Sequence, residues 1–476
     1  MYYESLLDIT ALVTLPEPIH LTISGQSRTP MLMMLDGPCD TTRHRMRKVE
    51  AKVGILVLVD NSIYRKYLQG SGNDPGAAMT RISQYYSMVV SMVDQRFGTI
   101  SEPHLRISVR MSALVVFKTR EESTWLENIV DWTTLRSHGR GSVFAEYALQ
   151  KLTTWISGSN GLPEFDHAML FTGYRLTNSE EATLGGMAYL KAICDVQSGN
   201  AISIVFDIGD FQCIKVATHE LAHSLGAYHD GDRQEQHCRP DSNFIMSPLN
   251  TYSHQVMKNA FYFSTCSIQD MWQHLSSTSS SCVRDEPPVY QFHDVSRSPP
   301  GKLYNADVQC KLAFGGRSVL CKDDKVVSIM CGQLWCSDPD KPSGCRTNTY
   351  MTALPGTPCG HDMVCHLGEC ILDNSQNNAH RPLSSHIKVV STIPQHVRQS
   401  VQGSDFERQD PVILSLTVRA TRRSRKRKNR CTQDRNARYC DGLVRLNPSG
   451  CKRRSIRRYC CITCRRLRRK LRKHNS

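Results

Sequence analysis

The sequence predicts an α/β domain over residues 50–285, followed by two small disulfide-rich modules. Between residues 50 and 285, apolar runs of strand length alternate with stretches of helical periodicity. Fourteen of the 20 cysteines gather in two later clusters. Most of the positive charge lies near the C-terminal end. A chain of 476 residues can hold one full domain and such smaller modules.

The apolar pattern of residues 50–285 indicates the individual strands and helices of the first domain. Residues 53–60 form an apolar, β-branched run that is typical of a buried strand. Residues 76–98 carry apolar side chains at helical spacing and end on a glycine, which favours a helix. The remaining elements are expected as a strand at 105–117, an amphipathic helix at 142–157, and strands within 166–173 and 184–194.

The segments outside this domain differ from it in composition. Residues 298–372 hold eight cysteines and many polar residues, so we expect disulfides rather than an apolar core to hold them together. Residues 373–430 contain no cysteine and are expected to be a flexible basic linker. Six cysteines fall within residues 431–464, and a basic tail, 465–476, follows. Residues 1–49 are expected to be a prodomain remnant or a linker.

Cysteine usage indicates the compartment. Twenty cysteines, mostly clustered, are unusual for a reducing cytosol and predict disulfides and a secreted protein. No stretch of 18 apolar residues offers a membrane span. The first fifteen residues do not resemble a signal peptide, because acidic residues interrupt their apolar stretch. We therefore expect the export signal to be missing from this sequence.

The positive charge belongs to one end of the chain. Residues 419–476 contain 23 Lys and Arg against two acidic residues, a net +21, whereas the whole chain carries +15 and the rest therefore −6. Such density attracts polyanions, which outside the cell are heparan sulfate and related glycans rather than nucleic acid. Furin-type processing at the Arg-x-x-Arg spacings within 421–430, a nuclear signal and a solvated tail remain alternatives.

The run HELAHSLGAYHD at residues 219–230 contains the candidate metal ligands and a candidate catalytic residue. His219 and His223 are four residues apart, so on a helix both imidazoles emerge on one face and can reach one metal ion. Glu220 leaves the helix beside them, where it can bond a water held by the metal. Gly226 can end the helix in a left-handed conformation and bring His229 back as a third ligand.

This donor set predicts a catalytic site for one Zn²⁺. Three imidazole nitrogens leave the fourth tetrahedral position open, whereas a structural zinc site closes it with another Cys or His. Glu220 is then the general base for amide hydrolysis. The alternatives are an ordinary amphipathic helix with histidines satisfied in the core, and a structural zinc site that would not need Glu220.

The pattern HExxHxxGxxH, followed by FIMSP at residues 244–248, resembles the metzincin proteases, and Asp230 resembles the adamalysin (reprolysin) branch. This resemblance implies a mixed twisted sheet with flanking helices and a tight turn that places Met246 as a floor under the zinc. It also implies a substrate-binding edge strand near residues 183–195. The branch often binds a structural Ca²⁺ through an acidic residue on its first strand. Gly54 stands there beside Asp166, so we do not expect that calcium.

Five cysteines lie within the first domain, so at least one must be free or pair elsewhere: Cys194, Cys213, Cys238, Cys266 and Cys282. Cys39 is the nearest additional candidate. It could instead be a thiolate that blocks the zinc in a proenzyme.

The later modules carry further resemblances. Residues 300–371, with the eight cysteines from Cys310 to Cys370, resemble the disintegrin-like module of the ADAMTS proteases, which implies substrate docking outside the cleft or simple stabilisation. The six cysteines from Cys431 to Cys464 resemble the PLAC module of some ADAMTS and matrix proteins. No tryptophan lies in a WSxW context, so a thrombospondin repeat is not expected, and the chain is similar to shortened secreted metalloproteases of tick saliva.

These observations predict a secreted zinc metalloendopeptidase that cleaves matrix or plasma proteins. The competing hypothesis is a heparin-binding matrix protein whose protease domain is a vestige. Intact Glu220 and three intact histidines favour the enzyme. The natural substrate, the S1′ specificity, the disulfide pairing, the latency mechanism and the oligomeric state do not follow from the sequence.

Overall fold

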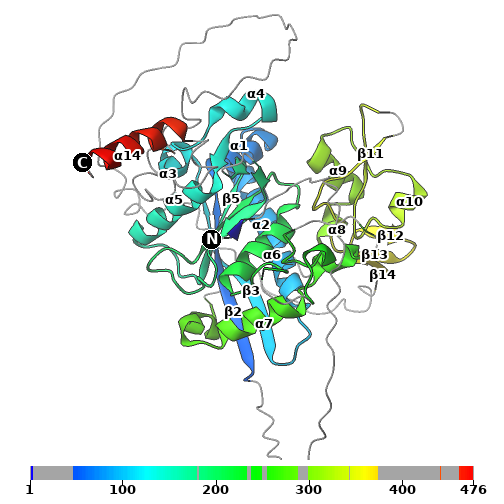
Figure 1. The fold of residues 1–476 in the computed structure, drawn as a ribbon. Coiled ribbons are helices and arrows are strands. Elements are labelled where there is room, and N and C mark those ends of the chain that lie inside the picture. Colours follow the sequence, from blue (N-terminus) through cyan, green and yellow to red (C-terminus); the bar gives the residue numbers. More distant parts are fainter. Residues whose placement is uncertain are drawn as a thin grey trace, which may run out of the picture.

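The computed structural model describes residues 2–3, 47–178, 182–232, 237–248, 253, 255–287, 299–341, 344–373, 440 and 460–474. Within them, the first domain is built on a six-stranded sheet of order β1-β8-β9-β5-β2-β3 (Figure 1). Strands β2, β3, β5 and β9 run parallel, whereas β8 is antiparallel to β9 and β1 is antiparallel to β8. The predicted mixed α/β fold is therefore confirmed. The strand bounds are β1 Tyr2–Tyr3, β2 Val49–Val59, β3 Leu105–Val116, β5 His167–Thr172, β8 Gly186–Ala188 and β9 Ile202–Phe206.

Strand β2 lies next to the edge strand β3 and pairs on both sides, with β3 and with β5. Its residues 53–59 are all buried, which explains their continuous apolar run. The strand begins earlier than predicted, at Val49, because Glu50 and Lys52 alternate with buried Val49 and Ala51 and hide the strand from a search for apolar runs.

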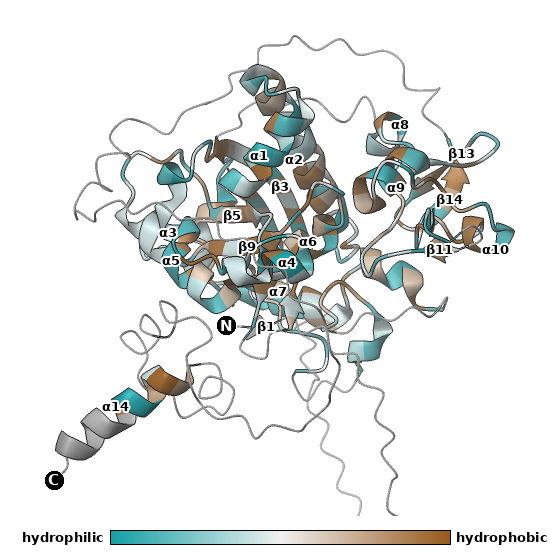
Figure 2. Cartoon of the chain, turned by 90° about the horizontal axis from the view of Figure 1, so that it is seen from above, coloured by the Kyte–Doolittle hydropathy of each residue, from teal (hydrophilic) through white to brown (hydrophobic). Residues whose placement is uncertain are grey.

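Helices cover both faces of the sheet. Ile55 and Val57 of β2 pack in one cluster with α2 and α6, whereas Leu56 and Leu58 pack in a second cluster with α5. Figure 2 shows the apolar residues gathered on the sheet and on the helices beside it. The helix bounds are α1 Asn61–Gly70, α2 Pro75–Phe97, α3 Thr124–Glu127, α4 Leu135–His138, α5 Ala145–Gly158, α6 Cys213–Ser224 and α7 Thr265–Leu275.

Local signals explain where these helices start. Helix α2 begins at Pro75 because the Asp74 carboxylate accepts hydrogen bonds from Gly76 N and Ala77 N. Helix α5 begins three residues later than predicted, since residues 142–144 form strand β4 instead. That strand belongs to a small sheet of β4 Ser142–Phe144, β6 Arg175–Thr177 and β7 Thr183–Leu184.

Short 3₁₀ helices complete the first domain: η1 Glu121–Ser123, η2 Trp132–Thr134, η3 Pro240–Ser242, η4 Met257–Phe261 and η5 Thr278–Arg284. Two disulfides join the domain internally, Cys194–Cys282 and Cys238–Cys266. Cys213 is free and buried. The predicted unpaired cysteine is therefore Cys213, and the two bridges need no contribution from Cys39, which lies outside the described residues.

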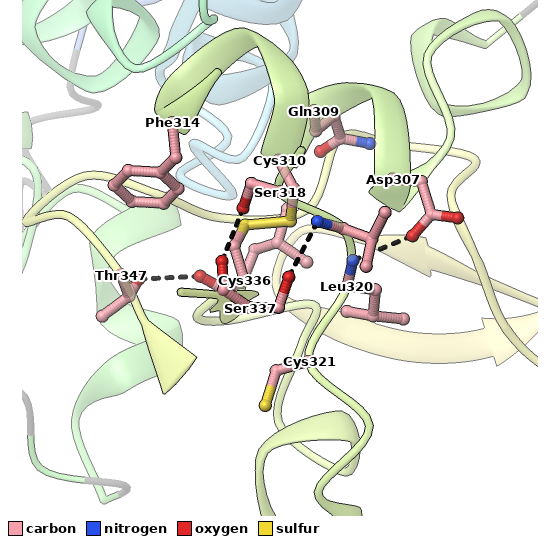
Figure 3. Close-up of a disulfide and its surroundings, with 12 residues drawn as sticks. Asp307, Gln309, Cys310, Phe314, Ser318, Leu320, Cys321, Cys336, Ser337 and Thr347 are labelled. Carbon is pink, nitrogen blue, oxygen red and sulfur yellow. Dashed lines mark hydrogen bonds between the residues drawn. A yellow bond between two sulfur atoms is a disulfide. The ribbon is translucent and has the colours of Figure 1, made fainter. Parts of the chain in front are cut away.

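The second module, residues 299–373, is held by four disulfides: Cys310–Cys336, Cys321–Cys345, Cys331–Cys365 and Cys359–Cys370. Figure 3 shows the first of them joining α9 to β10, beside a hydrogen bond from Ser318 Oγ to Ser337 O. The element bounds are α8 Pro300–Leu303, α9 Ala306–Phe314, α10 Asp324–Val327, β10 Cys336–Ser337, β11 Cys345–Arg346, β12 Pro358–Gly360, β13 Met363–His366 and β14 Glu369–Leu372.

The expectation that this module lacks an apolar core is only partly right. Met330, Leu334 and Met351 are buried in a small cluster among the cysteines. Leu354, 3% exposed, joins the main core of the first domain. The Tyr304 ring also lies 5.0 Å from that of Phe211. The module therefore shares buried surface with the first domain through Leu354 and Tyr304.

Near the C-terminal end, the structure describes the disulfide Cys440–Cys460 and the helix α14 Cys461–His474. Among the described residues, no helix is long and apolar enough to cross a membrane. The expected remnant at 1–49, the linker at 373–430 with its processing sites, and most of the 431–464 module lie largely outside the described residues.

Candidate metal centre

Helix α6 carries the first two histidines into the interior of the domain. All its residues from Cys213 to Ser224 are buried. His219 and His223 lie on one face, and His229 returns to them from beyond the helix. The Nε2 atom of His229 lies 3.1 Å from that of His219 and 3.2 Å from that of His223. The sequence prediction that these three residues meet is thus reproduced by their geometry.

Backbone carbonyls orient two of the imidazoles. His219 Nδ1 lies 2.8 Å from Ile245 O, and His223 Nδ1 lies 2.8 Å from Ala227 O. A carbonyl oxygen can only accept a hydrogen bond, so each Nδ1 carries the proton. Each Nε2 therefore keeps its lone pair available for a metal ion. Burial lowers the pKa of His219 and of His223 well below the ordinary value, which keeps both rings neutral.

This donor set fits Zn²⁺. Tetrahedral zinc with Zn–N bonds of about 2.0–2.1 Å separates its nitrogen ligands by roughly 3.4 Å. The measured separations of 3.1 and 3.2 Å lie close to that value. His219, His223 and His229 also form a buried group whose ligand atoms could hold one metal ion.

Glu220 follows His219 on helix α6 and packs against the strand β8. The side chain is 1% exposed. A Cβ built on Gly186 of β8 would come within 2.7 Å of Glu220 Oε1 and of Glu220 Cγ. The glycine in β8 therefore lets the strand backbone approach the Glu220 carboxylate closely.

Gly226 ends the helix as predicted, with φ of +117°. A Cβ at this position would lie 2.6 Å from His274 Cβ and 3.2 Å from Asp270 O. Both the backbone angle and the close approach of α7 therefore require glycine here.

The segment that contains Met246 is tied to the histidine segment. Met246 is fully buried, and its carbonyl accepts a hydrogen bond of 3.0 Å from Asp230 N. The Asp230 carboxylate accepts from the hydroxyls of Ser264 (2.5 Å) and Ser267 (3.2 Å) at the start of α7. No role for these two serines was predicted from the sequence, although Ser264 occupies an N-cap position that its spacing could have revealed.

A second polar network that the sequence did not reveal leads into α6. The Asp207 carboxylate accepts hydrogen bonds of 2.9 Å from the hydroxyls of Tyr85 and Tyr86, and all three side chains are buried. Tyr85 Oη also accepts from Phe211 N, two residues before α6 begins. Two consecutive tyrosines within an apolar helix could have indicated this network from the sequence, since a buried tyrosine needs a polar partner.

Gly54 and Asp166, where the sequence did not predict a calcium site, contact each other directly. Gly54 N donates to Asp166 Oδ2 at 2.8 Å. A Cβ at Gly54 would meet Ser112 Oγ at 2.4 Å and Pro287 Cβ at 2.8 Å. An acidic side chain at position 54 would therefore clash with these neighbours.

Two known domain families match parts of the chain. The reprolysin (M12B) family zinc metalloprotease matches residues 141–287, and the ADAMTS cysteine-rich domain 2 matches residues 300–371. A Bombyx mori protein named "A disintegrin and metalloproteinase with thrombospondin motifs like" is 29% identical over 338 residues, which cover 67% of this chain and 44% of that protein. Human "A disintegrin and metalloproteinase with thrombospondin motifs 16" is 28% identical over 337 residues, covering 68% and 24%. The chain thus spans less than half the length of these relatives.

Proposed function

The chain carries a metalloprotease domain of the reprolysin (M12B) family followed by an ADAMTS cysteine-rich domain, and from this premise we propose a secreted zinc endopeptidase that cleaves extracellular proteins. The resemblance expected from the sequence is confirmed for these two regions, whereas the PLAC module stays a prediction. The observation that supports the proposal most is the convergence of three Nε2 atoms beside a buried glutamate.

In this proposal His219, His223 and His229 hold one Zn²⁺ through their Nε2 atoms. When bound there, the ion supplies a Lewis acid for the scissile carbonyl and lowers the pKa of water. The chain's own contribution is orientation. The carbonyls of Ile245 and Ala227 fix two ring tautomers, and the buried Met246 forms the floor beneath the histidines.

Glu220 acts as the general base. Its carboxylate takes a proton from the attacking water and later gives that proton to the leaving amine, while the C–N bond breaks. The closeness of this side chain to the backbone of β8 supports the role, because a substrate carbonyl held on β8 would lie close to the carboxylate.

Strand β8 binds the substrate by strand addition. Its inner side pairs with β9, and its outer side pairs antiparallel with β1, with Tyr2 opposite Ala188 and Tyr3 opposite Met187. The outer side thus accepts an extended segment, as main-chain recognition of a peptide requires. A substrate would take the place that β1 occupies.

Replacement of Glu220 tests the proposal. We expect Glu220→Gln to lower kcat on a protein substrate by about 10²–10⁴-fold while the zinc content stays at one ion per chain. Chelation by phenanthroline should abolish wild-type turnover. Equal turnover of wild type and variant, insensitive to the chelator, would instead favour a matrix protein with a vestigial protease domain.

For the extracellular setting, we propose retention on heparan sulfate through the basic C-terminal segment. The helix α14 has the sequence CITCRRLRRKLRKH, which places dense positive charge on one short element. The full chain should elute from immobilised heparin at higher salt than a chain that ends at Gln409. Elution of both at the same low salt would contradict this partner.

A further inference from the structure

Apart from the metal centre, a pocket of about 750 Å³ lies at the carboxyl edge of the sheet. Among the described residues, its lining includes none of the three histidines and not Glu220. Helix α1 forms one wall, and the segment containing η2 and α4 forms the other. Its floor is made by residues that directly follow β5 and β9, including Gly173 and Ile208.

The topology of the sheet favours a binding site at this place. From β2 the chain passes first to β3 on one side and then to β5 on the other. The connections therefore diverge from the carboxyl ends of β2 and β5, which opens a crevice there. Open α/β sheets bind ligands in such crevices. The volume also falls within the usual range of about 300–1,000 Å³ for ligand pockets.

Cationic side chains line the pocket. Lys66 Nζ donates to Ile208 O, and Arg140 Nη1 donates to Gly173 O at 3.4 Å. The Arg140 guanidinium also lies 5.3 Å from the centre of the Phe206 ring. Arg65 extends from the exposed side of α1. Two of the cations are thus held in place before any ligand binds, which reduces the entropic cost of binding.

Apolar side chains lie beside these cations. Trp132 is 41% exposed and Leu135 is 47% exposed, both unusually high for large apolar residues. The Trp132 ring is held edge-on by Tyr174, with ring centres 5.6 Å apart. Tyr174 is fixed in turn by its hydroxyl, which donates to the Glu127 carboxylate at 2.8 Å. An oriented, exposed tryptophan beside arginine is the usual composition of an energetic centre for protein binding.

The carboxylates around the pocket are engaged in internal hydrogen bonds. Asp207 accepts from two tyrosine hydroxyls, Asp210 accepts from Gln212, and Asp60 accepts from Thr172 and Ser62. Asp60 and Asp207 are almost fully buried. Among the described lining residues, the exposed side chains are therefore basic, apolar or uncharged polar: Arg65, Lys66, Trp132, Leu135, Gln69 and Asn73.

We propose that this pocket binds an acidic peptide segment that carries an aromatic or large aliphatic residue, as a docking site for protein substrates away from the metal centre. The acidic side chains pair with Arg140, Lys66 and Arg65, while the apolar side chain packs on Trp132 and Leu135. The use of the site for substrates rests on the proposed protease function. Binding itself does not, so it can be tested without turnover.

The experiment measures binding of two labelled peptides to the full chain carrying Glu220→Gln, by fluorescence anisotropy. One peptide is Glu-Glu-Phe-Glu-Glu, and the other has serine in place of phenylalanine. The basic tail attracts both equally through charge, so their difference reports the pocket. We expect the phenylalanine peptide to bind about tenfold more tightly. Trp132→Ala and Arg65→Gln should each remove most of this preference.

Arg106→Gln is the matched control, because Arg106 is exposed on β3 at the amino edge of the sheet. It removes the same charge and should leave the preference unchanged. Equal affinity of both peptides for the parent protein would overturn the proposal. The proposal would also be overturned if Arg65→Gln lost binding of a heparin hexasaccharide but kept binding of the peptide. The pocket would then be assigned to a glycan. If Glu220→Gln keeps the peptide preference but the wild-type protein shows no protease activity, the pocket still binds the peptide. Only its role in docking substrates would then be rejected.

Discussion

At the scale of single residues, two positions control how the metal centre is built. Gly226 lets the chain leave α6 with a positive φ and pass closely beneath α7. His167 lies behind the helix, fully buried, with its ring nitrogens 3.1 Å from Ser224 Oγ and 2.9 Å from Ser203 Oγ. Neither residue belongs to the histidine cluster, yet both lie against the C-terminal end of the helix that carries His219 and His223.

Gly226→Ala should weaken zinc binding and stability together. The new Cβ would meet His274 Cβ at 2.6 Å, and the backbone angle is unfavourable for alanine. We expect a loss of about 1–3 kcal/mol in the free energy of unfolding and a lower zinc content, since the turn positions His229. Chemical denaturation and metal analysis measure both. Gly158→Ala at the end of α5, where nothing lies within 4 Å, should be neutral or stabilising. Equal effects of the two changes would contradict the argument.

His167 predicts a pH dependence of stability. Burial lowers its pKa to about 3, so the folded protein keeps the ring neutral while the unfolded chain takes up a proton below about pH 6.5. The free energy of unfolding should therefore fall as the pH drops from about 6.5 towards 3. Relative to His167→Gln, wild type should lose about 2 kcal/mol more between pH 7.5 and pH 5.0.

Urea unfolding at the two pH values measures this difference. His138→Gln, at the exposed last residue of α4, is the matched control and should keep the wild-type pH dependence. A pH dependence that is unchanged in His167→Gln would refute the role assigned to the buried ring.

At the scale of elements, a disulfide between residues far apart in the sequence encloses the segment that contains the histidine cluster. Cys194 follows β8 and Cys282 lies in η5, so their bond closes a loop of 88 residues that includes β9, α6 and α7. Cys213, at the first position of α6, is free and buried, and burial raises the pKa of its thiol well above the usual value. Cys194 and Cys282 are partly buried and bonded to each other, whereas Cys213 is buried and free.

Removing this bridge should cost more than removing the free thiol. We expect the double change Cys194→Ala with Cys282→Ala to lower the free energy of unfolding by about 2–4 kcal/mol, because a long loop regains entropy in the unfolded chain. Cys213→Ala should cost only about 1 kcal/mol, from a small cavity. Denaturant unfolding compares them. A larger loss for Cys213→Ala would mean that packing, not the bridge, dominates.

At the scale of the whole molecule, the second module and the first domain share buried surface. Leu354 of the second module is buried among residues of the first domain, and Tyr304 packs against Phe211 just before α6. Lys215 of α6 also lies 5.7 Å from the centre of the Tyr350 ring. The module therefore contacts the beginning of the helix that carries His219 and His223.

Leu354→Ala should destabilise both domains together. Loss of a buried leucine costs about 2–5 kcal/mol, and because the residue lies in the shared core we expect a single calorimetric transition at lower Tm. Leu372→Ala is the control, since Leu372 is 66% exposed and should change the free energy of unfolding by less than about 0.5 kcal/mol. Two separate transitions in wild type would show that the domains unfold independently.

The sequence by itself determined the parts of the protein that depend on near neighbours. The four-residue spacing of His219 and His223, the adjacent Glu220 and the helix-ending Gly226 predicted the ligand set, because helical geometry relates residues one turn apart. Alternating apolar periods likewise predicted the α/β class and the main elements. Errors fell at boundaries, as at Val49, where charged residues point outward along a strand whose other side is buried.

Only the tertiary structure decided which distant residues meet. Eight cysteines in the second module allow 105 pairings, and packing selects one of them. The serines that bond Asp230, the tyrosines that bond Asp207, and the pocket between α1 and η2 also come from segments far apart in the chain. Local periodicity carries no information about such contacts, since they arise from how the faces of helices and strands bury their apolar surface against one another.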